Sequence, residues 1–205
     1  MADGQFLNPT SPKSKRAPII VLGIGLLVGL AAGMALFGGL SRWWPSSVVP
    51  AGTPGTPAPA PVAGAPAPDF TLTDTSGKSI TLSSLKGQVV LINFWATWCE
   101  PCQREMPAIQ HEFETRRDSG FVVLAVDAAE TGPRIEADIR NFGSKYGVTF
   151  PLLLDPGIVV NDLYRVRGYP TSFFVNRAGV IAAEHVGELT GKQLSDTLAK
   201  LDSKD

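Results

Sequence analysis

The chain has 205 residues, 44% of them hydrophobic, and its 18 basic and 19 acidic side chains nearly cancel. This balance argues against a nucleic acid or a strongly charged partner. The apolar residues are spread unevenly along the chain, so each segment predicts its own structure.

An uncharged apolar segment at residues 19–40 predicts a transmembrane anchor. Its 22 residues would form a helix of about 33 Å, enough for a hydrocarbon core of about 30 Å. Basic residues at 13–16 and tryptophans at 43–44 predict a cytoplasmic tail at 1–18, with the rest of the chain outside the cytoplasm. The alternative is a cleaved signal peptide, whose apolar core is usually only about 7–15 residues.

The next segment, residues 41–68, is predicted to be a linker rich in proline and alanine. Residues 45–68 contain eight prolines and no charge. Proline-rich chain favours an extended, semi-rigid conformation and cannot bury a core. Residues 69–205 have the size of one compact domain.

The predicted domain opens with two short strands in 69–82, around a turn at Ser76–Gly77, because apolar and polar residues alternate there. Residues 83–87 form a helical turn or loop. The continuous apolar run at 88–96 predicts a strand covered on both faces. A helix should begin near Cys99, because apolar residues follow at helical spacing: Cys102, Met106, Ile109 and Phe113.

The second half alternates strands and helices before ending in a hairpin and a helix. The expected elements are a buried strand at 120–128, a helix at 134–146, a strand at 150–155, a short helix at 157–164, a hairpin at 171–187 and a helix from Thr190 that buries Leu194, Leu198 and Leu201. Thr190 and Gln193 match a capping box. This order predicts an α/β fold with a mixed central sheet.

The only cysteines, Cys99 and Cys102, allow three interpretations: a structural disulfide, part of a metal site, or a redox centre. The closed loop is too short for much entropic stabilisation. A structural zinc site needs four ligands, but His111, nine residues after Cys102, and His185, in the predicted hairpin, lack the paired spacing of a zinc site. Cu(I) held by two thiolates is more plausible than zinc, because thiolates suit this soft ion.

A redox centre explains the spacing best. At a helix start, unpaired N–H groups and the helix dipole stabilise the Cys99 thiolate. Cys102, one turn later, is placed to attack a mixed disulfide formed by Cys99. Trp95 and Trp98 are expected to shape the surrounding surface, although Trp95 is equally compatible with the core.

The stretches "FWATWCEPC" and "GYPT" resemble the thioredoxin superfamily. The anchor, the spacer, the leading hairpin and "REMP" after the second cysteine resemble its membrane-tethered branch, which includes TlpA, ResA and CcmG type disulfide reductases. The resemblance covers about residues 67–205. It implies a thioredoxin fold with a cis peptide bond before Pro170, which faces the cysteine pair, and a backbone at Tyr169 that pairs with the bound substrate.

The same resemblance assigns further site residues. Asn93 replaces the buried aspartate of cytoplasmic thioredoxins, whereas Glu105 stands where the tethered branch carries a glutamate. If partly buried, Glu105 would have a raised pKa and could exchange protons with the thiols near neutral pH; the alternative is an exposed helix acid. Trp98, Glu100 and Pro101 are candidate substrate contacts, with Glu100 facing solvent.

The expected activity is therefore extracytoplasmic thiol–disulfide exchange, with reduction of partner disulfides the favoured direction. The resemblance implies apocytochrome c as a substrate, a membrane thiol-electron transporter as the reductant, and no cofactor beyond the Cys99–Cys102 disulfide. Two rival functions are a copper-handling dithiol protein and a peroxiredoxin-like peroxidase. The peroxidase is disfavoured, because Ala96 and Ile92 replace the hydroxyl residue and the proline of its peroxide site.

Overall fold

The computed structural model describes residues 57–127, 132 and 134–202. The predicted cytoplasmic tail, the anchor and the linker up to residue 56 lie outside this range. Among the described residues, no helix combines the length and apolarity that a bilayer crossing requires.

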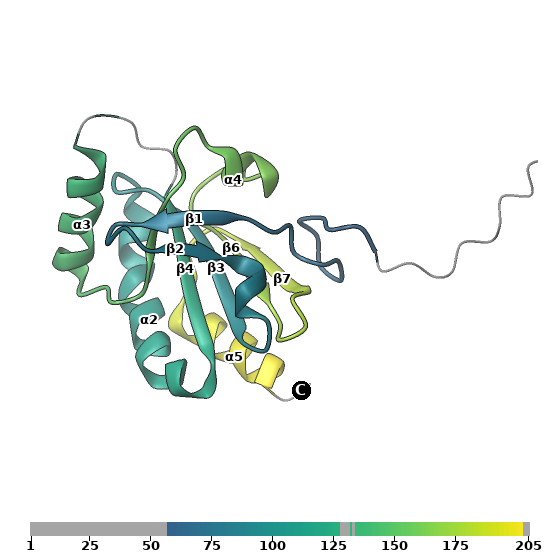
Figure 1. Ribbon diagram of the computed structural model, residues 1–205. Helices are drawn as coiled ribbons and strands as arrows, with labels where there is room; N and C mark the ends of the chain where they lie inside the picture. The colour runs from purple at the N-terminus through teal and green to yellow at the C-terminus, as the bar shows by residue number, and fades with distance from the viewer. Residues whose placement is uncertain (1–56, 128–131, 133, 203–205) are drawn as a thin grey trace, which may run out of the picture. The chain divides into compact units, whose positions relative to one another are not determined.

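A mixed seven-stranded sheet forms the centre of the domain, in the order β2-β1-β5-β4-β3-β6-β7 (Figure 1). Its strands are β1 (Thr71–Asp74), β2 (Ser79–Thr81), β3 (Val89–Trp95), β4 (Phe121–Asp127), β5 (Leu152–Leu154), β6 (Thr171–Val175) and β7 (Ile181–Val186). The helical segments are η2 (Leu82–Leu85), α2 (Glu100–Arg116), η3 (Arg117–Ser119), α3 (Ile135–Tyr146), α4 (Val159–Leu163) and α5 (Gly191–Asp202). The predicted α/β thioredoxin fold is confirmed.

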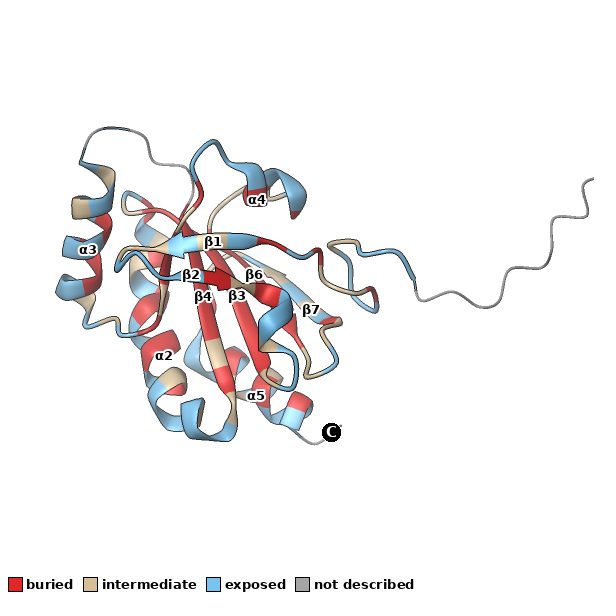
Figure 2. Cartoon of the chain, viewed as in Figure 1, coloured by how far each residue is buried: buried red, intermediate tan, exposed pale blue. Residues whose placement is uncertain are grey.

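The core lies on both faces of the sheet, as Figure 2 shows by the buried central strands. Alternate side chains of β3 enter opposite layers: Leu91 and Trp95 join the side chains of α2, α3 and α5, whereas Ile92 and Phe94 join those of η2 and α4. This alternation follows from the two-residue period of a strand. It explains why the sequence of β3 is continuously apolar.

The last helix begins as the sequence predicts. The backbone N–H of Thr190 donates to Gln193 Oε1 at 3.0 Å, and the N–H of Gln193 donates to Thr190 Oγ1 at 3.3 Å. This capping box satisfies two backbone donors at the helix start. The apolar face of α5, with Leu194, Leu198 and Leu201, is buried as expected.

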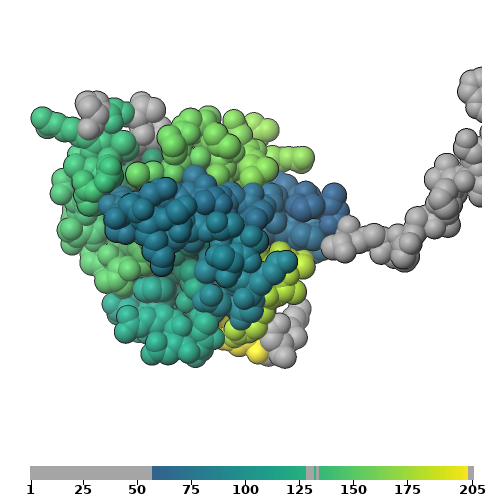
Figure 3. Space-filling model, in the orientation of Figure 1, coloured from purple at the N-terminus to yellow at the C-terminus, as the bar shows by residue number. Residues whose placement is uncertain are grey.

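The described end of the proline-rich segment packs on the domain instead of standing free. Gly64 N–H donates to Ile181 O at 2.8 Å and Ala67 N–H donates to Gly179 O at 3.0 Å. Figure 3 shows this blue segment against the yellow-green β6–β7 region. The folded part therefore extends further toward the N-terminus than the predicted boundary at residue 69. The composition predicts an extended chain. It does not reveal that this chain hydrogen-bonds at the start of β7, which is an edge strand of the sheet.

The strand register brings Pro170 to the end of β3 that precedes the cysteines. β4 runs parallel to β3, so their carboxyl ends meet at one edge, where Trp95 pairs with Asp127. β6 runs antiparallel, and its first residue Thr171 pairs with Phe94. The loop before β6 and the loop after β3 therefore meet at the same edge of the sheet.

Replacing Phe173 by alanine is expected to lower the free energy of unfolding by about 3–5 kcal/mol, because a large buried ring would be lost. Phe173 is almost inaccessible, and its ring centroid lies 5.1 Å from Tyr164 and 6.0 Å from Phe94. Urea titration measures this change. Val159→Ala, at an exposed position on α4, is the control and should change stability by less than about 0.5 kcal/mol. Equal effects would contradict the assignment of Phe173 to the core.

Candidate active site

Cys99 and Cys102 form a disulfide where β3 leads into α2, with their Cα atoms 5.2 Å apart. Cys99 is the N-cap of α2, and its Sγ accepts the backbone N–H of Cys102 at 3.2 Å. A helix N-terminus and a donated N–H both favour a negatively charged sulfur. Cys99 is 4% exposed and Cys102 is 0% exposed, so a partner reaches Cys99 more readily.

The loop before Cys99 is hydrogen-bonded to α2, and a second hydrogen bond links the same side chain of α2 to α3. Gln103 Nε2 donates to Thr97 O at 2.7 Å, and Tyr146 Oη donates to Gln103 Oε1 at 2.8 Å. These bonds hold Gln103 between the loop and α3. The position of Cys99 therefore depends on contacts from three segments.

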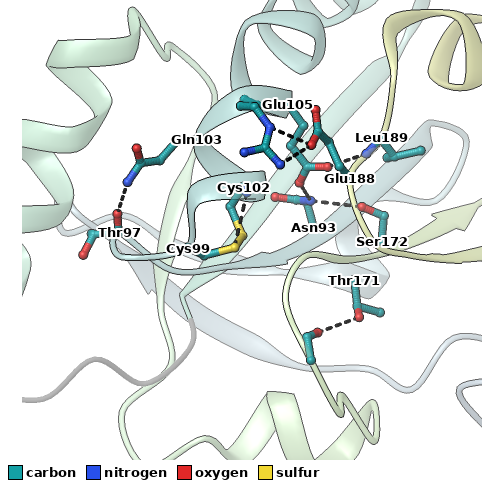
Figure 4. Close-up of a disulfide and its surroundings, with 12 residues drawn as sticks. Asn93, Thr97, Cys99, Cys102, Gln103, Glu105, Thr171, Ser172, Glu188 and Leu189 are labelled. Atoms are coloured by element: carbon teal, nitrogen blue, oxygen red, sulfur yellow. Dashed lines mark hydrogen bonds and ion pairs between the residues drawn. A yellow bond between two sulfur atoms is a disulfide. The ribbon is translucent and has the colours of Figure 1, made fainter.

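Glu105 is buried one turn after Cys102, with 1% of its surface exposed. One carboxyl oxygen accepts Asn93 Nδ2 at 2.8 Å, and the other accepts the backbone N–H of Leu189 at 2.8 Å. Asn93 Nδ2 also donates to Ser172 Oγ at 3.0 Å. Figure 4 shows that these residues converge beside the disulfide from β3, α2, β6 and the loop before α5.

Burial raises the pKa of Glu105 from 4.5 to about 7. The hydrogen bonds from Leu189 and Asn93 lower this pKa, and the nearby charge of Glu188 raises it slightly. Near neutral pH the carboxyl group can therefore either accept or donate a proton. Glu105 is therefore a buried acid, and the alternative of an exposed helix acid does not hold.

The three candidate contacts around Cys99 differ in exposure. Trp98 is 68% exposed beside the disulfide, and its ring meets that of Tyr169 edge-on at 6.0 Å. The Glu100 side chain is 83% exposed, as expected, and pairs with Arg104 at 3.2 Å. Pro101 occupies the first turn of α2, where a missing backbone N–H costs no helical hydrogen bond.

The Tyr169–Pro170 peptide bond is cis, as the resemblance implies. Pro170 is buried, whereas Tyr169 is half-buried. Thr171 Oγ1 donates to Gly168 O at 2.8 Å across the turn, and Gly187 N–H donates to Pro170 O at 2.9 Å. Hydrogen bonds therefore stabilise the cis-proline loop both internally and against the loop after β7.

Other sequence candidates lie away from this site. Trp95 is fully buried against Phe142 at 4.3 Å, so it belongs to the core and does not shape the surface. His111 is exposed on α2, and His185 on β7 hydrogen-bonds to Glu188 O at 3.2 Å. Across the described ranges, no three His, Cys, Asp or Glu side chains are grouped closely enough to hold a metal.

Several groups at this site have no signal in the sequence. The backbone N–H of Leu189 and the hydroxyl of Ser172 reach Glu105 and Asn93 from positions far along the chain. Asn161 accepts a hydrogen bond from Tyr169 Oη at 2.9 Å, although it resembles an ordinary helix residue. Each depends on a contact between separate elements of the fold, which no local pattern encodes.

A disulfide at a helix start, set beside a cis-proline loop on this mixed sheet, defines a thioredoxin-like thiol–disulfide oxidoreductase. Comparison with known proteins agrees. The chain belongs to the AhpC/TSA family, which matches residues 63–184.

Individual relatives carry the same class of activity in their names. Thiol-disulfide oxidoreductase ResA of Bacillus thuringiensis (strain Al Hakam) is 38% identical over 135 residues, covering 66% of this chain and 76% of the relative. ResA of Bacillus subtilis (strain 168) is 39% identical over 130 residues, covering 63% and 70%. The thioredoxin domain of a thiol-disulfide oxidoreductase from Bacteroides vulgatus superposes with a TM-score of 0.59 at 30% identity, covering 68% of this chain and 96% of that domain.

Proposed function

We propose that this oxidoreductase works as a reductant of partner-protein disulfides outside the cytoplasm, held at the membrane by residues 19–40. The observation that carries this proposal is the buried Glu105 beside a cysteine pair at a helix start, in a chain with no other cysteine. A carboxyl group with a pKa of about 7 can move the protons that thiol–disulfide exchange requires.

In the proposed reaction the Cys99 thiolate attacks one sulfur of the partner disulfide. A Cys99–partner bond forms, the partner disulfide breaks, and the leaving partner sulfur takes up a proton. Glu105 as carboxylate accepts the proton of Cys102, whose sulfur then attacks Cys99 Sγ. The Cys99–Cys102 disulfide forms and the second partner sulfur leaves and is protonated, so two electrons pass to the partner.

The proposed docking surface surrounds Cys99. Pro170 and the backbone of Tyr169 would receive the partner chain, and Trp98, Glu100 and Pro101 would contact it. Trp98 is the most exposed aromatic ring beside the disulfide, which suits apolar contact with a partner. A membrane thiol-electron transporter would return two electrons to the disulfide after each cycle.

The proposed substrate is an apocytochrome c whose haem-attachment cysteines have become oxidised. The resemblance to the membrane-tethered reductases supports this choice. A peroxidase is less well supported, because the buried Ala96 provides no hydroxyl group three residues before Cys99.

The reduction potential of the Cys99–Cys102 pair tests the proposed direction. Equilibrating the full-length chain with thiol–disulfide buffers, followed by alkylation of free thiols, should give a potential near or below about −230 mV, in the range of thioredoxin-like reductants. A potential of about −120 to −180 mV would instead identify an oxidant or isomerase and would exclude cytochrome reduction.

A further inference from the structure

A buried polar network fixes the start of α4 beneath the cis-proline loop. The Asp155 carboxylate, 2% exposed, accepts the backbone N–H of Val160 at 3.0 Å and that of Asn161 at 2.9 Å. It also accepts Asn161 Nδ2 at 2.8 Å. A buried carboxylate that receives several N–H groups is well compensated for its lost hydration.

The side-chain amide of Asn161 has only one orientation compatible with this network. Its Nδ2 donates both to Asp155 Oδ2 and, at 3.0 Å, to the backbone oxygen of Asp127 at the end of β4. Rotating the amide by 180° would set an oxygen against these two acceptors. Asn161 Oδ1 must therefore face the other way, where it accepts a hydrogen bond.

The donor to Asn161 Oδ1 is the hydroxyl group of Tyr169, at 2.9 Å. Burial raises the pKa of Tyr169, and the charges of Asp127, Asp155 and Asp162 raise it further, so the phenol stays protonated and keeps donating. The Tyr169 ring also meets the exposed ring of Trp98. A continuous set of contacts thus links the buried Asp155 to the aromatic surface beside Cys99.

We propose that Asn161 is a positioning residue, which holds the Tyr169 side chain and thereby fixes both the cis-proline loop and Trp98 for docking of a protein partner. The inference rests on the proposed function, because it assumes that a partner docks beside Pro170. Asn161 itself touches neither the sulfur atoms nor the partner. Its effect should therefore fall on partner binding and spare the chemistry of the disulfide.

Tyr169→Phe tests the inference, because it removes only the hydroxyl group. The reduced full-length chain, in detergent micelles, is mixed with increasing concentrations of insulin as the disulfide protein, and the rate of single-turnover oxidation is followed by acid quench and alkylation. The half-saturating insulin concentration should rise about tenfold, the scale of one lost hydrogen bond. The limiting rate, and the rate constant for oxidised glutathione, should change by less than about twofold.

Tyr164→Phe is the matched control. Tyr164 Oη donates a comparable buried hydrogen bond to Pro68 O at 2.7 Å, but its ring packs in the core with Phe70, Phe94 and Phe173. This variant should lose stability without any change in half-saturation. Asn161→Ala should match Tyr169→Phe, and the double variant should be no worse than the single ones. Tyr169→Phe decides alone if Asn161→Ala does not fold.

An unchanged half-saturation in Tyr169→Phe, or equal shifts in Tyr169→Phe and Tyr164→Phe, would overturn the inference. If the unsubstituted chain does not reduce insulin but oxidises reduced ribonuclease A, the proposed direction fails. The same comparison is then made with reduced ribonuclease A, because the docking surface serves both directions. A chain that reacts with glutathione but with neither protein overturns both proposals.

Discussion

Replacing Cys102 by serine is expected to convert a transient partner complex into a stable covalent one. Cys99 can still attack a partner disulfide, but no second sulfur is left to release the mixed disulfide. Cys99→Ser should lower the rate of partner reduction by about 10³-fold or more, because the attacking sulfur is lost. Non-reducing electrophoresis of the full-length variants, isolated from cells with thiols blocked, would detect the trapped complex, and single-turnover oxidation of the reduced chain by insulin would measure the rate.

Two further variants make this experiment specific. The double variant Cys99→Ser/Cys102→Ser should trap nothing, and Cys99→Ser should trap little, because Cys102 is fully buried. Adducts that contain extracytoplasmic proteins and dissociate when the disulfide is reduced would support the proposed function. Loss of bound copper without any trapped protein would instead support a copper-handling role.

Glu105→Gln is expected to lower the rate of partner reduction at pH 7 by about 10²-fold, because the substitution removes a group that can accept the Cys102 proton. The glutamine side chain has nearly the same size, so the core around it should stay filled. Single-turnover oxidation of the reduced chain by insulin, measured from pH 5 to pH 9, reports the effect. The unsubstituted chain should gain rate as Glu105 ionises near pH 7, and this inflection should be absent from the variant.

Stability should respond to pH through the same carboxyl group. The pKa of Glu105 is about 7 in the folded protein and near 4.5 when exposed, so the folded state holds more protons between these values. The stability that protonation contributes is complete below about pH 4.5 and is lost as the pH rises through about 7. The loss is on the order of 3 kcal/mol, at about 1.4 kcal/mol per pKa unit.

Urea unfolding of the oxidised protein at several pH values would isolate this contribution. Glu105→Gln should lack the fall in stability between pH 4.5 and pH 7. Glu112→Gln, at another buried acid on α2, leaves Glu105 in place and should therefore keep that fall. Parallel pH profiles for Glu105→Gln and the unsubstituted chain would contradict the raised pKa.

Local sequence patterns determined most of the architecture. The apolar run of β3, the helical spacing from Cys102 onward and the Thr190–Gln193 capping box each predicted an element that the structure confirms. These signals work because strand and helix periods act over a few neighbouring residues. The cysteine spacing likewise placed the disulfide at the start of a helix, since both residues belong to one turn.

Local patterns were weaker where burial depends on distant segments. Trp95 and Trp98 are three residues apart and equally apolar, yet one is in the core and the other is exposed. Trp95 still belongs to β3, whereas Trp98 lies in the loop beyond it, where the sheet no longer covers the chain. The proline-rich composition similarly gave no indication of the hydrogen bonds that residues 64 and 67 make to the β6–β7 region.

The sequence alone therefore determined the fold class, the redox pair and the candidate proton carrier. Only the tertiary structure decided the environment of Glu105, because its buried carboxyl group accepts the backbone N–H of Leu189 from a loop far along the chain. The same holds for the contact of Tyr169 with Asn161, which joins the cis-proline loop to α4 through a single hydroxyl group. Proton affinity and loop position arise from desolvation and hydrogen bonding among segments brought together by folding, and no local pattern encodes them.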